Sequence, residues 1–279
     1  CYARALDITE ATHPVLCRSA SRFGTLLENV TLDHMTRDLD FSDRRLTMNA
    51  RSAFPRTSIE RTCGEESCSH PTHIFLLTRD NMGVLPPIAR MTPDQAAFTF
   101  LTSFVSSLTE TEGRPGDVRP GVQTGDVSRE LLTHIKPQEY AKRFMELIAK
   151  HNVRCWFLNT GTFSEPAERA MRIDLRLTRA LVRAAINGEL DNVPYERDPL
   201  FQLEIPKHCP GVPDDALDPR KAAGDSGEYE LRANRLALDF IKGFERFELE
   251  MPESVREMVA AVPILDESVD LLEDMGFNF

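Results

Sequence analysis

The sequence lacks any apolar run near the roughly 20 residues that a membrane-spanning helix needs. A basic start followed by an apolar stretch, the pattern of a secretory signal, is also absent. Positive charge is scarce, because 33 Lys and Arg stand against 44 Asp and Glu and give a net charge of -11. Such a surface repels polyanions, so we expect neither nucleic acid nor an anionic membrane as a partner. We expect a cytoplasmic protein that binds anionic ligands through local arginines.

Cysteines are few and widely spaced. The six cysteines stand at positions 1, 17, 63, 68, 155 and 209, which is not the framework of a small disulfide-bonded secreted domain, so we expect reduced thiols. Cys63, Cys68, His70 and His73 offer zinc-type ligands, but the two pairs lack the intervening element of a zinc finger. We therefore expect no metal here, and a zinc-binding module is the weaker alternative.

Length and periodicity predict a mixed α/β protein. A chain of 279 residues can bury a substantial core as one large domain or two small ones. The apolar run Ile74–Leu77 is typical of a strand buried on both faces, and the turn after it ends in two prolines. A helix then begins with Thr92 as N-cap, Pro93 at its first position and Gln95 placed to close a capping box, and its apolar face extends to Leu108.

The rest of the chain continues this alternation. Further strands are expected at 3–8, 26–30 and 153–158, and further helices at 137–150, from Thr178 to Gly188, and from Asp225 to Phe244. Residues 109–127 contain four glycines and two prolines, which predicts a long loop of the kind that often serves as a lid. The proline-rich segment 194–219 is expected to be extended surface chain.

Several short segments, taken in order, resemble ATP-dependent phosphoenolpyruvate carboxykinase. The first is GVLPP at 83–87 with the Thr-Pro-capped helix after it. Cys1-Tyr2-Ala3-Arg4 is similar to that family's CYAK segment, with Arg for Lys. Further matches, in the family's order, are LLENV at 26–30, TMNAR at 47–51 for TENTR, NTG at 159–161, TRA at 178–180, NGEL at 187–190, EIP at 204–206 and DPR at 218–220.

The resemblance implies a fold and an activity. The fold would be the family's mixed α/β C-terminal nucleotide-binding domain, with residues of about 45–120 as a smaller β-rich insertion leading into the 109–127 lid. The family decarboxylates oxaloacetate and transfers the γ-phosphoryl of ATP to the resulting enolate, giving phosphoenolpyruvate, ADP and CO₂ in gluconeogenesis. It also implies a divalent metal, Mn²⁺ or Mg²⁺, whose ligands lie upstream of this chain.

The resemblance also assigns roles to individual residues. Arg51 would bind the γ-phosphate and the substrate carboxylate as the catalytic residue, since guanidinium suits bidentate recognition. Glu28 would contact the ribose or the metal-bound phosphates. Arg172 and Ile173 would hold the adenine, and the Thr178 hydroxyl would bond its edge while also capping a helix. The alternatives are a surface arginine, a solvated glutamate, a strand edge and a plain N-cap.

Departures from the family pattern leave a second function open. Thr109-Glu110 stand where the family's lid has Ala-Gly before Thr111-Glu112, and the segment 162–172 has lost every glycine of the family's run and gained one proline and two glutamates. No glycine is followed by Lys-Thr or Lys-Ser at the spacing of a phosphate loop. Because the chain starts at Cys1 without an initiator Met, we expect a fragment that needs its N-terminal remainder. The alternative is a catalytically inactive relative that binds a nucleotide or a protein partner.

Overall fold

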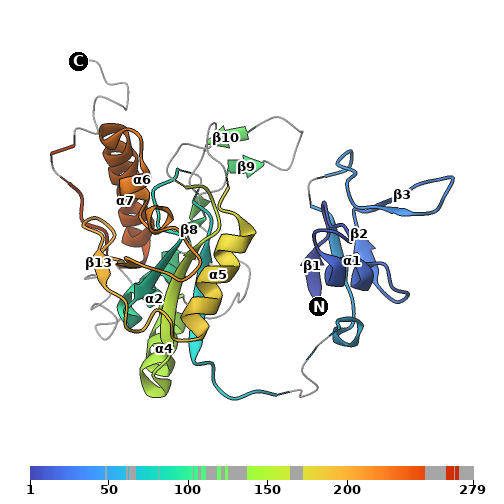
Figure 1. Ribbon diagram of the computed structural model, residues 1–279, viewed down its shortest axis with the longest axis horizontal. Helices are drawn as coiled ribbons and strands as arrows, with labels where there is room; N and C mark the ends of the chain where they lie inside the picture. Colours follow the sequence, from blue (N-terminus) through green and yellow to red (C-terminus); the bar gives the residue numbers. More distant parts are fainter. Residues whose placement is uncertain are drawn as a thin grey trace. The chain divides into compact units, whose positions relative to one another are not determined.

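The computed structural model (Figure 1) divides the chain into two compact units, Cys1–Ser69 and His70–Phe279, which are described separately. The structure describes residues 1–47, 49–60, 62, 67–80, 82–102, 104–105, 108–110, 118–120, 123–124, 137–163, 172–248, 262–266 and 268–269. The boundary between the units falls within residues 45–120, the segment expected as a smaller insertion, so each unit contains part of it. No described helix is long and apolar enough to cross a membrane.

The first unit is built on a three-stranded antiparallel sheet in the order β1-β5-β2. Its elements are β1 (Tyr2–Arg4), α1 (Pro14–Ala20), β2 (Leu26–Glu28), β3 (Thr31–Leu32), β4 (Leu39–Asp40), β5 (Arg51–Ala53) and the 3₁₀ turn η1 (Arg56–Ser58). The strand expected at 3–8 ends at Arg4, because the chain turns at Asp7, whose φ is 59°. Ala5, Leu6 and Ile8 enter the unit's core instead.

The second unit is built on a mixed five-stranded sheet in the order β13-β14-β7-β12-β6. Its strands are β6 (His73–Thr78), β7 (Ile88–Met91), β12 (Arg154–Asn159), β13 (Tyr195–Arg197) and β14 (Glu204–Pro206). Strands β12 and β6 are parallel, and the other pairs are antiparallel. The mixed α/β class is thus confirmed.

Helices cover both faces of this sheet. They are α2 (Pro93–Thr102), α4 (Pro137–His151), α5 (Leu175–Ile186), α6 (Pro219–Ala222) and α7 (Ser226–Glu248), with the 3₁₀ turn η2 (Asp214–Ala216). On β12, Cys155 and Phe157 point into a core shared with α2, α4 and α7, whereas Trp156 and Leu158 point into a core shared with α5. The central strand β12 is therefore buried on both faces.

Three expectations about these elements are wrong. The strand at 74–77, expected to be buried on both faces, is part of β6, which lies at the edge of the sheet and leaves Leu77 69% exposed. The segment 194–219 is not surface chain, because β13 and β14 join the sheet and Leu200, Phe201 and Leu203 between them are buried. The helix expected to carry an apolar face as far as Leu108 ends at Thr102. Short strands follow it, with β8 (Phe104–Val105) pairing with β11 (Gln123–Thr124) and β9 (Leu108–Glu110) with β10 (Val118–Pro120). Thr111 and Glu112 of the expected lid lie outside the described residues.

The capping box at the start of α2 is confirmed. The Gln95 backbone N–H donates to Thr92 Oγ1 at 3.2 Å, and the Thr92 N–H donates to Gln95 Oε1 at 2.9 Å. Two donors that a helix start leaves without intrahelical partners are thereby satisfied.

The turn after β6 is organised by the fully buried carboxylate of Asp80. Asp80 accepts hydrogen bonds from the backbone N–H groups of Met82, Val84 and Leu85, each at 2.7 Å. From β12, Asn159 accepts from the Asp80 N–H at 3.0 Å and donates to the Leu85 carbonyl at 2.9 Å. The Asp80 turn, residues 80–85, is thus fixed to the ends of both parallel strands.

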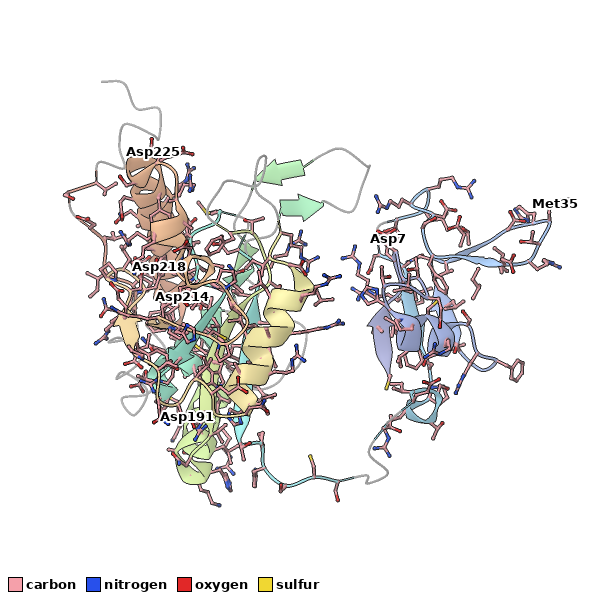
Figure 2. All side chains as sticks on the ribbon, in the orientation of Figure 1. Asp7, Met35, Asp191, Asp214, Asp218 and Asp225 are labelled. Atoms are coloured by element: carbon pink, nitrogen blue, oxygen red, sulfur yellow. The ribbon has the colours of Figure 1, made fainter. Side chains whose placement is uncertain are left out.

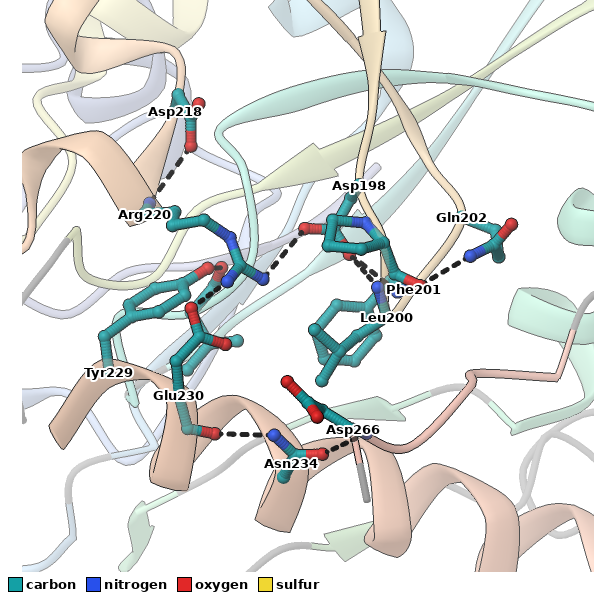
Figure 3. A network of polar contacts seen from close by, with 12 residues as sticks. Asp198, Leu200, Phe201, Gln202, Asp218, Arg220, Tyr229, Glu230, Asn234 and Asp266 are labelled. Carbon is teal, nitrogen blue, oxygen red and sulfur yellow. Dashed lines mark hydrogen bonds and ion pairs between the residues drawn. The ribbon is translucent and has the colours of Figure 1, made fainter. Parts of the chain in front are cut away.

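Helix α7 reaches the same turn through a second polar network, shown in Figure 3. The buried Tyr229 hydroxyl donates to the Val84 carbonyl at 3.0 Å. The Arg220 guanidinium lies 5.1 Å from the Tyr229 ring centroid, pairs with Glu230, and lies 3.8 Å from Asp198. Burial raises the pKa of Asp198, although it accepts two backbone hydrogen bonds and faces Arg220. Arg220 of the DPR segment therefore connects α7 to the chain between β13 and β14.

Replacing Asp80 with Ala should destabilise the second unit by about 3 kcal/mol or more, because two buried N–H donors and one half-buried N–H donor would lose their acceptor. The single tryptophan, Trp156, is buried in this unit and reports its urea unfolding by fluorescence. Asp174→Ala is the matched control, since the exposed Asp174 caps one N–H of α5 and should cost only about 1 kcal/mol. Equal losses in the two variants would contradict this ranking.

His151 should make the second unit less stable as the pH falls. Burial, and then the nearby His70 and Lys150, lower the pKa of His151 below its usual 6.5. The unfolded chain therefore takes up a proton near pH 6.5 that the folded state resists, so stability present above that pH is lost below it. Between about pH 7.5 and 5.5, His151→Gln should flatten the loss measured by Trp156 fluorescence, whereas His34→Gln in the other unit should not. An unchanged pH dependence in His151→Gln would refute the assignment.

Candidate functional site

Two of the residues singled out from the sequence face each other in the first unit. Glu28 on β2 lies directly opposite Arg51 on β5, and Arg4 on β1 lies opposite Arg51 on the other side. In an antiparallel sheet, residues opposite each other project from the same face. The opposite face carries Leu27 and the buried Ser52, which pack toward the unit's interior.

The face that carries the charges is open to solvent. Glu28 and Arg4 are exposed and Arg51 is half-buried. The register places two arginines and one glutamate side by side on this face, so positive charge exceeds negative charge there. We call Tyr2, Arg4, Glu28 and Arg51 the basic strand face.

Two neutral side chains hold the charged ones on this face. The Tyr2 hydroxyl donates to Glu28 Oε2 at 2.7 Å, and the Arg51 Nε–H donates to Asn49 Oδ1 at 2.6 Å. The hydrogen bond to Glu28 raises the pKa of Tyr2. Sequence reasoning did not find Tyr2 or Asn49. The available signal was their spacing, since each lies two residues before an arginine and so on the same side of an extended chain.

In the second unit, the NTG segment forms a tight turn at the end of β12. The Asn159 side-chain oxygen accepts from the Gly161 N–H at 2.8 Å, and the Thr162 N–H donates to the Asp80 carbonyl. A Cβ added to Gly161 would lie 1.9 Å from that Asp80 carbonyl oxygen, so only glycine fits. The glycine is therefore needed for close approach of two backbones.

This turn positions Arg172 and Ile173. The Arg172 Nε–H donates to the Thr160 carbonyl at 3.0 Å, and the Ile173 N–H donates to the Gly161 carbonyl at 2.9 Å. Both residues thus lie at the carboxyl ends of the parallel strands β6 and β12, the edge at which α/β sheets commonly bind ligands. Residues 164–171, which connect Thr162-Phe163 to Arg172 in the sequence, lie outside the described residues.

The expected role of Thr178 as N-cap is wrong. Helix α5 begins at Leu175 with Asp174 as its N-cap, whose side chain accepts from the Arg176 N–H at 2.7 Å. Thr178 lies one turn further along, and its N–H and hydroxyl both donate to the Asp174 carbonyl, at 3.1 and 3.4 Å. An aspartate four residues earlier satisfies the helix start better than threonine does, because its carboxylate is a charged acceptor.

The surroundings of Arg172 are basic. Helix α5 carries Arg176, Arg179 and Arg183 and no acidic residue, and all three arginines are exposed. The acidic residues labelled on this unit in Figure 2 (Asp191, Asp214, Asp218 and Asp225) belong to other segments. Local arginines thus stand out on a chain whose net charge is -11.

The structure therefore gathers the candidate residues in two groups. Glu28 and Arg51 lie together in the first unit, and Arg172, Ile173 and Thr178 surround the start of α5 in the second. Each group combines cations with hydrogen-bonding groups, which suits phosphates and a base respectively.

Metal ligands do not converge in the part of the chain that the structure describes. No group of three His, Cys, Asp or Glu side chains there could hold a metal ion. The His70 ring stacks on His151 with centroids 3.6 Å apart, and His73 Nδ1 lies 3.0 Å from Thr72 Oγ1. Cys63 of the cysteine-histidine cluster lies outside the described residues.

Known proteins match this chain over most of its length. The family model described as phosphoenolpyruvate carboxykinase covers residues 1–215, which include the basic strand face and the NTG turn. Phosphoenolpyruvate carboxykinase (ATP) of Alkaliphilus oremlandii is 40% identical over 248 residues, which are 89% of this chain and 47% of the relative. The enzyme of that name from Caldanaerobacter subterraneus is 38% identical over 256 residues, 92% of this chain and 48% of the relative.

The chain thus spans about half the length of the curated relatives it matches. The resemblance drawn from the short segments is confirmed, since the family model includes all but the DPR segment. This chain belongs to the ATP-dependent phosphoenolpyruvate carboxykinase family.

Proposed function

We propose that this chain is the nucleotide-binding half of an ATP-dependent phosphoenolpyruvate carboxykinase, which converts oxaloacetate and ATP into phosphoenolpyruvate, ADP and CO₂ in gluconeogenesis. The observation that carries the proposal is the register that sets Arg51 between Arg4 and Glu28 on an exposed sheet face. Phosphoryl transfer spreads negative charge over oxygens, and the protein contributes chiefly by positioning and by cations. The N-terminal remainder would supply the phosphate loop.

Arg51 is the proposed catalytic residue. Its Nε–H is taken by Asn49, which orients the guanidinium and leaves the two terminal nitrogens for oxygen ligands. These nitrogens would bind the γ-phosphate and the substrate carboxylate, so that the enolate oxygen and the phosphorus are held close together. Arg4 adds a second positive charge beside them.

An adenine base is proposed to bind at the start of α5 in the second unit. The Arg172 guanidinium plane would stack on the adenine, Ile173 would supply apolar contact, and the Thr178 hydroxyl would bond the base edge. In the first unit, Glu28 is proposed to contact a nucleotide's ribose or its metal-bound phosphates. This proposal is supported by the backbone hydrogen bonds that hold Arg172 and Ile173 at the ends of the parallel strands.

A divalent metal, Mn²⁺ or Mg²⁺, would neutralise phosphate charge when bound. Its ligands are proposed to come from the N-terminal remainder, as the resemblance to the family implies. The steps assigned to this chain are binding and orienting ATP and oxaloacetate.

An inactive relative that binds a nucleotide or a protein partner is the second candidate. The sequence between Thr162 and Arg172 favours it, since Glu165, Pro166 and Glu168 stand at positions where the family has glycines. Glutamates beside phosphates repel them, and proline restricts the backbone path.

Fusing this chain to the upstream half of the Alkaliphilus oremlandii relative should give phosphoenolpyruvate formation from oxaloacetate and ATP. Arg51→Ala should lower kcat/KM by about 10³-fold, because a cation facing the transferred phosphoryl would be lost. Arg45→Ala is the control, since Arg45 pairs with Asp43 away from the basic strand face. A folded fusion that binds ATP without turnover would favour the inactive relative.

Arg172→Ala should weaken ATP binding to that fusion by roughly ten-fold, because stacking on the base would be lost. Binding of inorganic tripolyphosphate, which has no base, should stay unchanged. Arg176→Ala, at an exposed arginine on the helix α5 that follows Arg172, provides the control. Calorimetric titration separates the two ligands, and an equal loss for both would argue against the adenine site.

A further inference from the structure

Glu28 and Arg51 carry opposite charges at directly opposed positions of adjacent strands. Such cross-strand pairs normally attract each other. Within the described part of the chain, however, the two side chains form no ion pair, and each is bound by a neutral neighbour, Tyr2 or Asn49. The register places Glu28 and Arg51 side by side, yet each side chain binds a neutral neighbour and not the other charge.

Tyr2 reaches Glu28 from the far side of the sheet. It lies on β1, whereas Glu28 lies on β2, and β5 runs between them. Tyr2 is in register with Ala53 of β5, whose small side chain lets the phenol cross that strand. The Arg51 guanidinium then lies 5.8 Å from the Tyr2 ring centroid. One tyrosine therefore contacts both charged residues.

Packing does not account for this tyrosine, because 63% of its surface is exposed. Its contacts have a consequence for ligand binding. An ion pair between Glu28 and Arg51 would neutralise the guanidinium and occupy the carboxylate, so neither would be available to a nucleotide. With Tyr2 and Asn49 in place, Glu28 keeps one carboxylate oxygen and Arg51 keeps its terminal nitrogens.

We propose that Tyr2 is a positioning residue that keeps Glu28 and Arg51 apart as two separate ligand-binding groups. The inference rests on the proposed function, because it takes Arg51 to bind phosphate oxygens. Asn49 assists by fixing the Arg51 Nε–H. The raised pKa of Tyr2, caused chiefly by its hydrogen bond to Glu28, agrees with this contact.

The test uses the 279-residue chain and inorganic tripolyphosphate, with binding followed by NMR at the Arg51 guanidinium. Tyr2→Phe removes the hydroxyl and lets Glu28 close onto Arg51, so tripolyphosphate should bind about two- to five-fold more weakly. The double variant Tyr2→Phe/Glu28→Gln should regain wild-type affinity, because an uncharged partner cannot neutralise Arg51. Leu26→Ala, at an exposed residue of the same sheet face, is the control and should bind as wild type does.

The outcomes separate this inference from the function on which it rests. A Tyr2→Phe variant that binds as wild type does, or a double variant that stays weak, overturns the positioning role alone. A wild-type chain that binds no tripolyphosphate overturns the proposed phosphate site as well. Glu28→Gln gives a check that needs no ligand: ultraviolet titration should show the pKa of Tyr2 falling toward 10.0, and an unchanged pKa overturns the contact.

Discussion

The buried Asp80 carboxylate is the interaction on which the second unit depends. It satisfies three backbone N–H groups of a turn that leaves the sheet through two prolines. The backbone of the same residue bonds Asn159 and Thr162, so the turn and the end of β12 are fixed together. A buried donor without an acceptor would cost about 1–3 kcal/mol, which explains why so many partners converge on one residue.

The proposed adenine site follows from that constraint. Because the Asp80 carbonyl lies where a Cβ of residue 161 would be, the chain passes through a glycine there and then bonds Arg172 and Ile173 through the carbonyls of Thr160 and Gly161. Tyr229 on α7 donates a hydrogen bond to the Val84 carbonyl of the same turn. Arg220 pairs with Glu230 of α7 and lies close to Asp198, between β13 and β14. Hydrogen bonds from several elements thus converge at the end of the sheet where the proposed base would lie.

In the first unit, charged side chains lie next to one another on one sheet face without pairing as Glu28 and Arg51 could. Arg51 lies between Arg4 and Glu28. The neutral side chain of Tyr2 binds Glu28, and that of Asn49 binds Arg51. Neutral hydrogen bonds suit this purpose because they orient a charged group without cancelling its charge.

The sequence by itself determined the α/β class, the capping box of α2, the presence of a strand at 74–77 and the family, since each depends on local pattern or short motifs. It could not give the role of 194–219, because its prolines suggest surface chain and only packing buries Leu200 and Phe201. Nor could it give the helix start at Asp174, where one acceptor outcompetes another four residues away. The tertiary structure alone decided that Tyr2, Glu28 and Arg51 meet, because strands distant in sequence come into register only through folding.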